Sequence, residues 1–139
     1  MTYDPNNVFA KILRGELPVQ KAYEDAETLA FMDIMPRADG HTLVIPKTPA
    51  RGLLDASPAQ LAACMKTVQI VSRAVTAAFA ADGLTLQQFN EAAGGQVVFH
   101  LHFHVLPRHE GVALRPPGTM AKGDVLVEHA GRIRAALRS

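Results

Sequence analysis

The sequence predicts a single α+β domain with a mainly antiparallel sheet, one long helix, a short N-terminal helix and a C-terminal helix. Two observations lead to this fold class. Short β-rich runs separated by turn residues occur in both halves of the chain, and helical periodicity is confined to three segments. The 139 residues are the length of one domain able to bury a core, and no repeat or linker divides them.

The N-terminal half is expected to hold one short helix and three strands. Residues 8–13 place apolar side chains at helical spacing, with Asn7 as a candidate cap and Gly15 as the stop. The acidic turn at residues 24–27 predicts a hairpin, and Pro36 marks the loop after it. The expected strands cover residues 20–24, 28–33 and 41–46.

The C-terminal half begins with a clear helix start. Ser57 is a good N-cap and Pro58 suits the first helical position, so a long helix is expected to run to about Ala81. A final amphipathic helix is expected over residues 124–137, after an irregular loop. The expected strands of this half cover residues 84–90 and 97–106.

Composition excludes several function classes. The formal net charge is only +1, which argues against a nucleic-acid-binding platform. No signal-peptide pattern opens the chain, and no apolar run approaches the roughly 20 residues that cross a bilayer. Cys64 is the only cysteine and falls in an apolar helical pattern, so we expect a buried thiol and no intramolecular disulfide. A cytoplasmic protein is the interpretation that fits these features.

The strand expected at residues 97–106 carries the most unusual pattern. His100, His102 and His104 alternate with apolar residues, so all three imidazoles are expected on one strand face, at roughly 6.6 Å intervals. Phe99 and the other intervening residues should point into a core. Three solvated histidines would be a plain explanation, but adjacent imidazolium groups would repel one another.

A metal site is a sharper alternative for the three histidines. Paired His-x-His residues on a strand are able to present two imidazoles to zinc. However, the outer pair on a straight strand would lie roughly 13 Å apart, so at most two could bind one ion. No Asp, Glu or Cys lies in or immediately beside the strand. We therefore expect no metal.

Nucleophilic catalysis fits the pattern better. A neutral imidazole is a good nucleophile toward phosphorus near neutral pH and forms a covalent intermediate that water later hydrolyses. The central histidine has a like neighbour on each side. One neighbour can support the phosphate and the other can donate to the leaving group.

These residues closely resemble the signature of the histidine-triad (HIT) superfamily, His-φ-His-φ-His-φ-φ with φ hydrophobic. Here it reads His100-Leu101-His102-Phe103-His104-Val105-Leu106. Further similar segments follow the family order, at residues 31–34, 40–47 and 90–97. The resemblance covers about residues 8–108, which we take as the triad core, with residues 109–139 as a C-terminal loop and helix. It implies a HIT-like fold, no cofactor, and a homodimer with one sheet continuous across both chains.

The resemblance also implies a role for each site residue. His102 would be the nucleophile, His104 would assist the leaving atom, and His100 would support the phosphate site. His41 would orient His102 from the neighbouring strand, and Asp33 would accept hydrogen bonds from the ribose. The base pocket would be lined by Val8, Phe9, Ile12, Phe31 and Ile34. The residues facing the phosphate or leaving group would be Asn90, Gly95, Gln96 and Val97.

Several of these residues have plainer explanations. Phe9, Ile12 and Phe31 have the spacing of ordinary core residues. Asp33 could cap the following turn. His41 could be a buried histidine with satisfied hydrogen bonds.

Departures from the family pattern are informative. Many bacterial relatives carry a Cys-x-x-Cys pair and a histidine that help bind a structural zinc. The matching positions here hold Asn7, Ala10 and Pro49, so we expect apolar packing to hold the N-terminal helix instead. Val97 stands where Ser or Thr is frequent, so one hydroxyl contact to the phosphate is expected to be missing.

The leading functional hypothesis is hydrolysis of purine nucleoside phosphoramidates or related nucleoside 5′-monophosphate derivatives, through a nucleotidyl-histidine intermediate. The Gly-Gly-Gln loop and the short chain most resemble the nucleoside-phosphoramidase branch. One alternative is a dinucleoside polyphosphate hydrolase, although no basic cluster for a longer phosphate chain is evident. Another is a nucleotide-binding interaction module with little turnover. All three have a small nucleotide as the partner, rather than a nucleic-acid polymer or a membrane.

Overall fold

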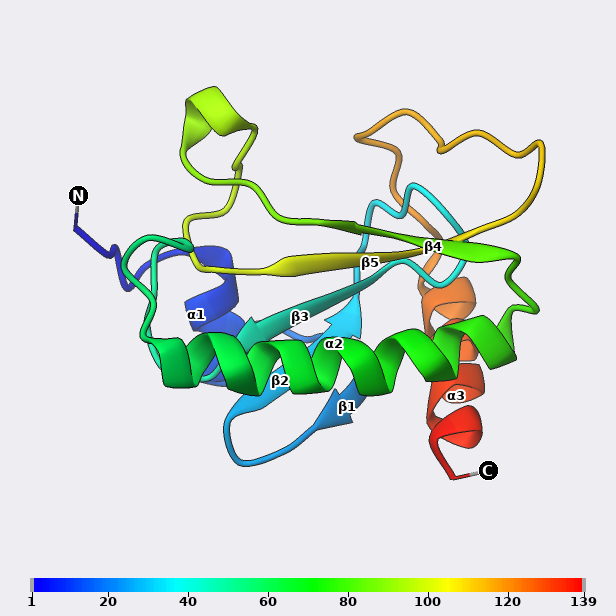
Figure 1. The fold of residues 1–139 in the computed structure, drawn as a ribbon, viewed down its shortest axis with the longest axis horizontal. Coiled ribbons are helices and arrows are strands. Elements are labelled where there is room, and N and C mark those ends of the chain that lie inside the picture. The colour runs from blue at the N-terminus through cyan, green and yellow to red at the C-terminus, as the bar shows by residue number, and fades with distance from the viewer. Residues whose placement is uncertain (1, 139) are drawn as a thin grey trace.

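The computed structural model describes residues 2–138 as three α-helices and a five-stranded antiparallel sheet (Figure 1). The strand order is β1-β2-β3-β5-β4, and every neighbouring pair is antiparallel. The α+β prediction is therefore confirmed. The helices are α1 (Val8–Leu13), α2 (Pro58–Ala78) and α3 (Gly123–Leu137), with a 3-10 turn at Ala92–Gly94. The strands are β1 (Lys21–Glu24), β2 (Thr28–Met32), β3 (Thr42–Pro46), β4 (Gly83–Gln87) and β5 (Phe103–Arg108).

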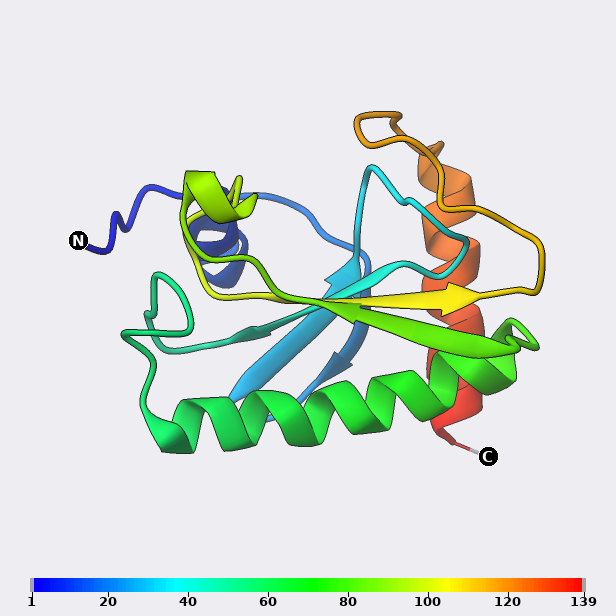
Figure 2. The same ribbon diagram turned by 45° about the horizontal axis from the view of Figure 1, so that its top comes forward.

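One face of the sheet forms the main core with α2 and α3. Alternation along the strands sends Ala30, Val44 and Val105 to this face, where they meet α2 residues such as Val71 and the α3 residue Ile133. Helix α2 crosses this face, and α3 lies beside one of its ends (Figure 2). The hydrophobic core of this face is thus shared by the sheet and the two longer helices.

The opposite face carries a smaller core beneath α1. Leu29 and Phe31 of β2, Leu43 and Ile45 of β3, and Phe9 of α1 form this second cluster. Asn7 caps α1 through its side chain, which accepts a hydrogen bond from the Ala10 amide. The expectation that apolar packing holds the N-terminal helix is therefore confirmed.

Most element boundaries lie within one residue of the sequence predictions, but α2 and β4 end about three residues early. The Ser57 cap of α2 is confirmed as a capping box with Gln60, but the helix ends at Ala78 because Ala80 adopts a positive φ of 48° and turns the chain. Strand β4 ends at Gln87 rather than at residue 90.

No helix within residues 2–138 is both long and apolar enough to cross a membrane.

The largest difference concerns the histidine strand. Strand β5 begins at Phe103, so His100 and His102 precede it, and the prediction of one continuous strand over residues 97–106 is wrong. The Leu101 amide donates to the Ala50 carbonyl instead of joining a ladder. Leu101, Phe103 and Val105 enter the main core as expected. Phe99 does not, because its ring lies under the Arg51 guanidinium, 4.4 Å away.

Candidate active site

The His102 imidazole is held by a single hydrogen bond to the backbone. Its Nδ1 lies 2.7 Å from the His100 carbonyl oxygen, so Nδ1 carries the proton and donates it. Nε2 then keeps its lone pair. The Phe9 ring meets the imidazole edge-on at 4.9 Å, and only 7% of His102 is exposed. The ring is thus fixed in the tautomer that a nucleophile requires.

The Nε2 atoms of His102 and His104 both reach the surface. Neither atom has a hydrogen-bond partner within residues 2–138. In this part of the chain every side-chain nitrogen or oxygen that is fully buried has a hydrogen-bond partner. A nitrogen without a partner is therefore exposed to solvent at least in part. Both nitrogens are therefore accessible to a ligand, and the two rings lie 5.0 Å apart.

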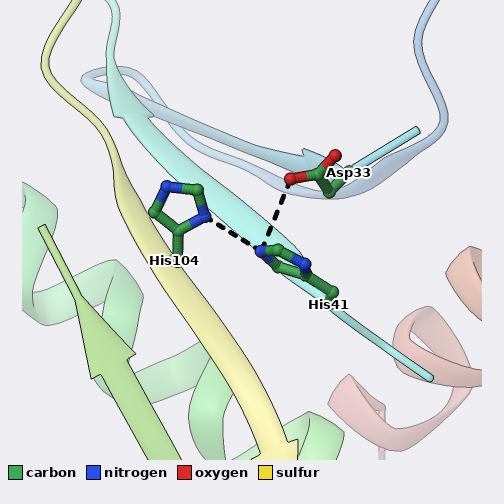
Figure 3. Close-up of side chains that lie close together, drawn as sticks. All are labelled: Asp33, His41 and His104. Carbon is green, nitrogen blue, oxygen red and sulfur yellow. Dashed lines mark hydrogen bonds and ion pairs between the residues drawn. The ribbon is translucent and has the colours of Figure 1, made fainter. Parts of the chain in front are cut away.

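His41 and His104 form a directed hydrogen-bond chain (Figure 3). The Arg37 amide donates to His41 Nδ1 at 3.1 Å, so the proton of His41 resides on Nε2. That N–H points to His104 Nδ1 at 2.9 Å and lies 3.4 Å from Asp33 Oδ2. His104 therefore carries its proton on Nε2, the accessible nitrogen.

All four imidazoles of the site are neutral near pH 7. Burial is the main cause that lowers the pKa of His41 to about 4 and that of His104 to about 3, with neighbouring cationic groups adding to the effect. Burial likewise lowers the pKa values of His100 and His102. A neutral His102 is able to attack phosphorus without first losing a proton.

The expectation that His41 orients His102 is wrong. His41 bonds to His104, and His102 is oriented by the His100 carbonyl. The His100 ring is fully buried, with Nδ1 2.6 Å from the Tyr3 hydroxyl and Nε2 2.8 Å from the Pro46 carbonyl. His100 thus contributes its backbone carbonyl to the site, while both nitrogens of its ring are bonded to Tyr3 and Pro46.

Asp33, His41 and His104 also form a candidate metal cluster, because one ligand atom from each lies within 4.8 Å of the others. The hydrogen bonds do not fit that role. His41 Nδ1 accepts the Arg37 amide, so its Nε2 holds a proton where a metal would need a lone pair. The arrangement favours a proton-bonded chain over a metal ion.

The structural zinc of bacterial relatives likewise has no suitable ligands at the matching positions. The Asn7 side chain is used as the α1 cap, and Ala10 and Pro49 carry no metal-ligating atom on their side chains.

Asp33 has two environments within one carboxylate. Its Oδ1 accepts from the Met35 amide at 2.8 Å, which is the turn cap considered from the sequence. Its Oδ2 lies beside His41. Burial raises the pKa of the carboxyl group, while the Met35 amide opposes that shift. The role toward a ribose stays a prediction.

The residues expected to line a base pocket divide into two groups. Phe9 and Phe31 are buried and their rings meet edge-on at 5.4 Å, with Ile12 packed against their cluster. Val8 and Ile34 are half-exposed. The first group serves as core and also reaches His102 through the contact of its ring with Phe9.

The Gly-Gly-Gln loop uses its polar groups internally. The Gln96 amide donates to the Arg51 and Val98 carbonyls and accepts from the Glu91 amide. Asn90 accepts from the Leu53 amide, and its amide group bonds to Gln88. These side chains shape the loop.

Gly95 and Val97 of the same loop are exposed to solvent. Gly95 adopts a φ of +98°, a conformation that favours glycine. Val97 is 83% exposed. Contacts of this loop with a phosphate stay a prediction.

Two residues of the site were missed by the sequence analysis. Tyr3 bonds to His100, and Arg37 bonds to His41 through its backbone. Neither falls in the motif, and no local pattern marks them. Only the fold brings them to the histidines.

Comparisons with known proteins point to one family. A family model of the HIT domain matches residues 14–111. Adenylylsulfatase HINT3 of Arabidopsis thaliana is 43% identical over 103 residues, which are 74% of this chain and 52% of that protein, so the chain spans about half of its length. An uncharacterised HIT-like protein of Mycobacterium tuberculosis is 40% identical over 91% of this chain and 88% of its own.

A solved structure agrees over nearly the whole chain. The Hit-like protein of Bartonella henselae superimposes with a TM-score of 0.95 at 53% identity, covering 98% of this chain and 99% of that one. The resemblance drawn from the triad is confirmed, and the chain belongs to the HIT family.

Proposed function

We propose that this protein hydrolyses nucleoside 5′-monophosphate derivatives at the α-phosphate, through a covalent intermediate on His102. The observation that carries the proposal is the accessible Nε2 lone pair of His102, with the opposite nitrogen committed to the His100 carbonyl. This tautomer presents a neutral nucleophile whose orientation is already set.

The proposed reaction has two steps. The His102 Nε2 lone pair forms a bond to phosphorus, and the bond from phosphorus to the leaving group breaks with its electron pair. The ring then bears positive charge, which the Nδ1–H bond to the His100 carbonyl stabilises. Water next forms a bond to phosphorus and loses a proton to solvent, while the bond from phosphorus to Nε2 breaks and its electron pair returns to the imidazole, which is neutral again.

His104 assists from the adjacent position. Its Nε2–H is accessible and donates a hydrogen bond to the leaving atom, while His41 holds its other nitrogen. Asp33 would bind the ribose through its carboxylate, and Phe9 would support the base side of the nucleophile.

Two substrate classes are in view. The sequence favours purine nucleoside phosphoramidates. The Arabidopsis relative is named an adenylylsulfatase, which supports a nucleoside phosphosulfate as a second candidate. Both release the same nucleotide, so they test the same nucleophile with different leaving groups.

The open edge of the sheet supports the homodimer expected from the resemblance. Strand β4 lies at this edge, and its Leu84 and Leu86 side chains are 43% and 48% exposed. An unpaired edge with apolar side chains is a template for pairing with a second chain. We propose that β4 pairs with β4 of a second copy of the chain across a two-fold axis. We also propose that the enzyme is cytoplasmic, which fits the free, buried thiol of Cys64.

The test is the intact mass of the protein after brief mixing with adenosine 5′-phosphoramidate and a mild quench. We expect a mass increase of one nucleoside monophosphate in the wild type and none in His102→Ala, with turnover reduced by at least about 10³-fold. Steady product release without an adduct would point to fast hydrolysis of the intermediate or to direct attack by water, which single-turnover mixing separates. Tight nucleotide binding without product would instead favour an interaction module.

A further inference from the structure

The inference rests on the proposed function and concerns the leaving group, which the triad itself does not specify. Two features beside His104 bear on it. One is the hydrogen-bond chain that fixes the His104 proton. The other is Arg37, whose backbone amide bonds to His41 Nδ1 and whose guanidinium Nε is held by the Arg115 carbonyl.

The chain opposes a second proton on His104. Its Nδ1 faces the Nε2–H of His41, and His41 cannot reverse its tautomer while the Arg37 amide donates to its Nδ1. A proton on His104 Nδ1 would therefore meet another donor at 2.9 Å. The titratable and charged groups facing this pair are the Arg37 guanidinium, the neutral His102 ring and, beside His41, the Asp33 carboxyl. His104 is thus a neutral hydrogen-bond donor and has no proton to give away.

Arg37 is a positive charge held without a carboxylate. Its Nε donates to the Arg115 carbonyl at 2.9 Å, and the Arg115 amide donates back to the Arg37 carbonyl at 2.8 Å. Within residues 2–138 its terminal nitrogens have no partner, whereas Arg51 and Arg115 pair with Glu91 and Asp39. The side chain is half-buried between two loops. Such a cation is placed to receive an anion.

We propose that Arg37, together with the neutral His41–His104 pair, selects leaving groups that depart as stable anions, such as sulfate or phosphate, over amines. When the bond from phosphorus to a sulfate oxygen breaks, the electron pair leaves with the sulfate, which needs no proton. Arg37 and the His104 N–H stabilise the departing charge. When a bond from phosphorus to nitrogen breaks, the amine has to gain a proton, and that proton comes from solvent because His104 has none to transfer.

The experiment compares adenosine 5′-phosphosulfate with adenosine 5′-phosphoramidate, two substrates that share one nucleotide. We expect Arg37→Gln to lower the ratio of their kcat/KM values, phosphosulfate over phosphoramidate, by about tenfold or more. Arg37→Lys keeps the charge and should restore part of that ratio. The backbone bond from residue 37 to His41 persists in both variants.

Arg115→Gln is the matched control. It removes a guanidinium already paired with Asp39 and leaves the carbonyl that holds Arg37, so the ratio should stay within about twofold of wild type. Equal losses for both substrates in Arg37→Gln, or no restoration by lysine, would overturn the role of the charge. A wild type that forms no adduct and hydrolyses neither substrate would overturn the proposed function as well.

Discussion

The two faces of the sheet bury polar groups in opposite ways. On the face covered by α2, the Asp25 carboxylate accepts from the Glu27 and Thr28 amides and the Thr28 hydroxyl, which also lies 2.6 Å from the Thr67 hydroxyl. Burial alone would raise the pKa of Asp25, but these hydrogen bonds lower it to about 2. Among the described residues, every buried polar atom of this cluster has a hydrogen-bond partner, so the cluster stabilises the fold.

On the α1 face, two imidazole nitrogens have no hydrogen-bond partner within residues 2–138. His102 and His104 are buried at their Nδ1 side and each keeps one partnerless nitrogen at the surface. Burial lowers the pKa values of both rings, so the folded chain keeps them neutral at acidic pH values where a free imidazole would be protonated. A polar group that is buried yet not fully bonded is costly, and at this face that cost supports chemistry.

The largest expected effect on folding comes from the apolar face. Ile133 on α3 is fully buried in the main core, so Ile133→Ala should lower the free energy of unfolding by about 3 kcal/mol. Val127→Ala on the same helix, at a side chain 51% exposed, should change it by less than about 0.5 kcal/mol. Urea denaturation measures both, and kcat/KM at low temperature should stay near wild type. A large loss of activity in Ile133→Ala would mean that the two faces are coupled.

The effect of acid on stability sharpens the comparison. The unfolded chain takes up protons near the ordinary histidine pKa of 6.5, whereas His41 and His104 resist protonation down to about 4 and 3. Their contribution to stability is therefore complete above pH 7 and is lost as the pH falls below 6.5. Asp25 contributes above pH 4 and loses its contribution only as the pH falls toward 2.

We expect the wild-type Tm to fall by at least about 5 °C between pH 7 and pH 5. In His104→Gln the fall should be smaller, because one group that resists protonation is gone. His129→Gln, which removes an imidazole packed on Phe79 away from the triad, should keep the wild-type slope. A Tm that does not change over this range would contradict the assignment of neutral buried imidazoles.

The sequence predicted the elements well because local signals agreed with the fold. The Ser57-Pro58 start of α2, the β1–β2 hairpin and the amphipathic C-terminal helix all formed where capping residues and periodicity placed them. The long histidine strand did not form, because alternation records which side chains are buried and not which amides join a ladder. Residues 100–102 alternate in sequence, but the Leu101 amide is bonded to the Ala50 carbonyl and the His100 ring to the Pro46 carbonyl.

The triad and the presence of His41 beside it were predictable from the motif and the resemblance, but the hydrogen bonds that the histidines make were not. His41 and His104 lie 63 residues apart, and their tautomers depend on a backbone amide of Arg37. Tyr3 and His100 lie 97 residues apart. Contacts at such separations depend on strand register and loop path, which no local pattern encodes.

Tyr3 gives the smallest expected effect and the closest comparison between the faces. Tyr3→Phe removes the donor at Nδ1 of the fully buried His100, whose carbonyl orients the nucleophile, so kcat/KM should fall by up to about tenfold with KM little changed. The ¹⁵N shift of His100 Nδ1 should change in parallel, which a purely structural loss would not produce. Tyr23→Phe is the matched control, since it removes a hydroxyl bonded to Asp25 on the other face and should leave kcat/KM unchanged. If the two variants behave alike, Tyr3 holds the N-terminal segment in place and does not position the site.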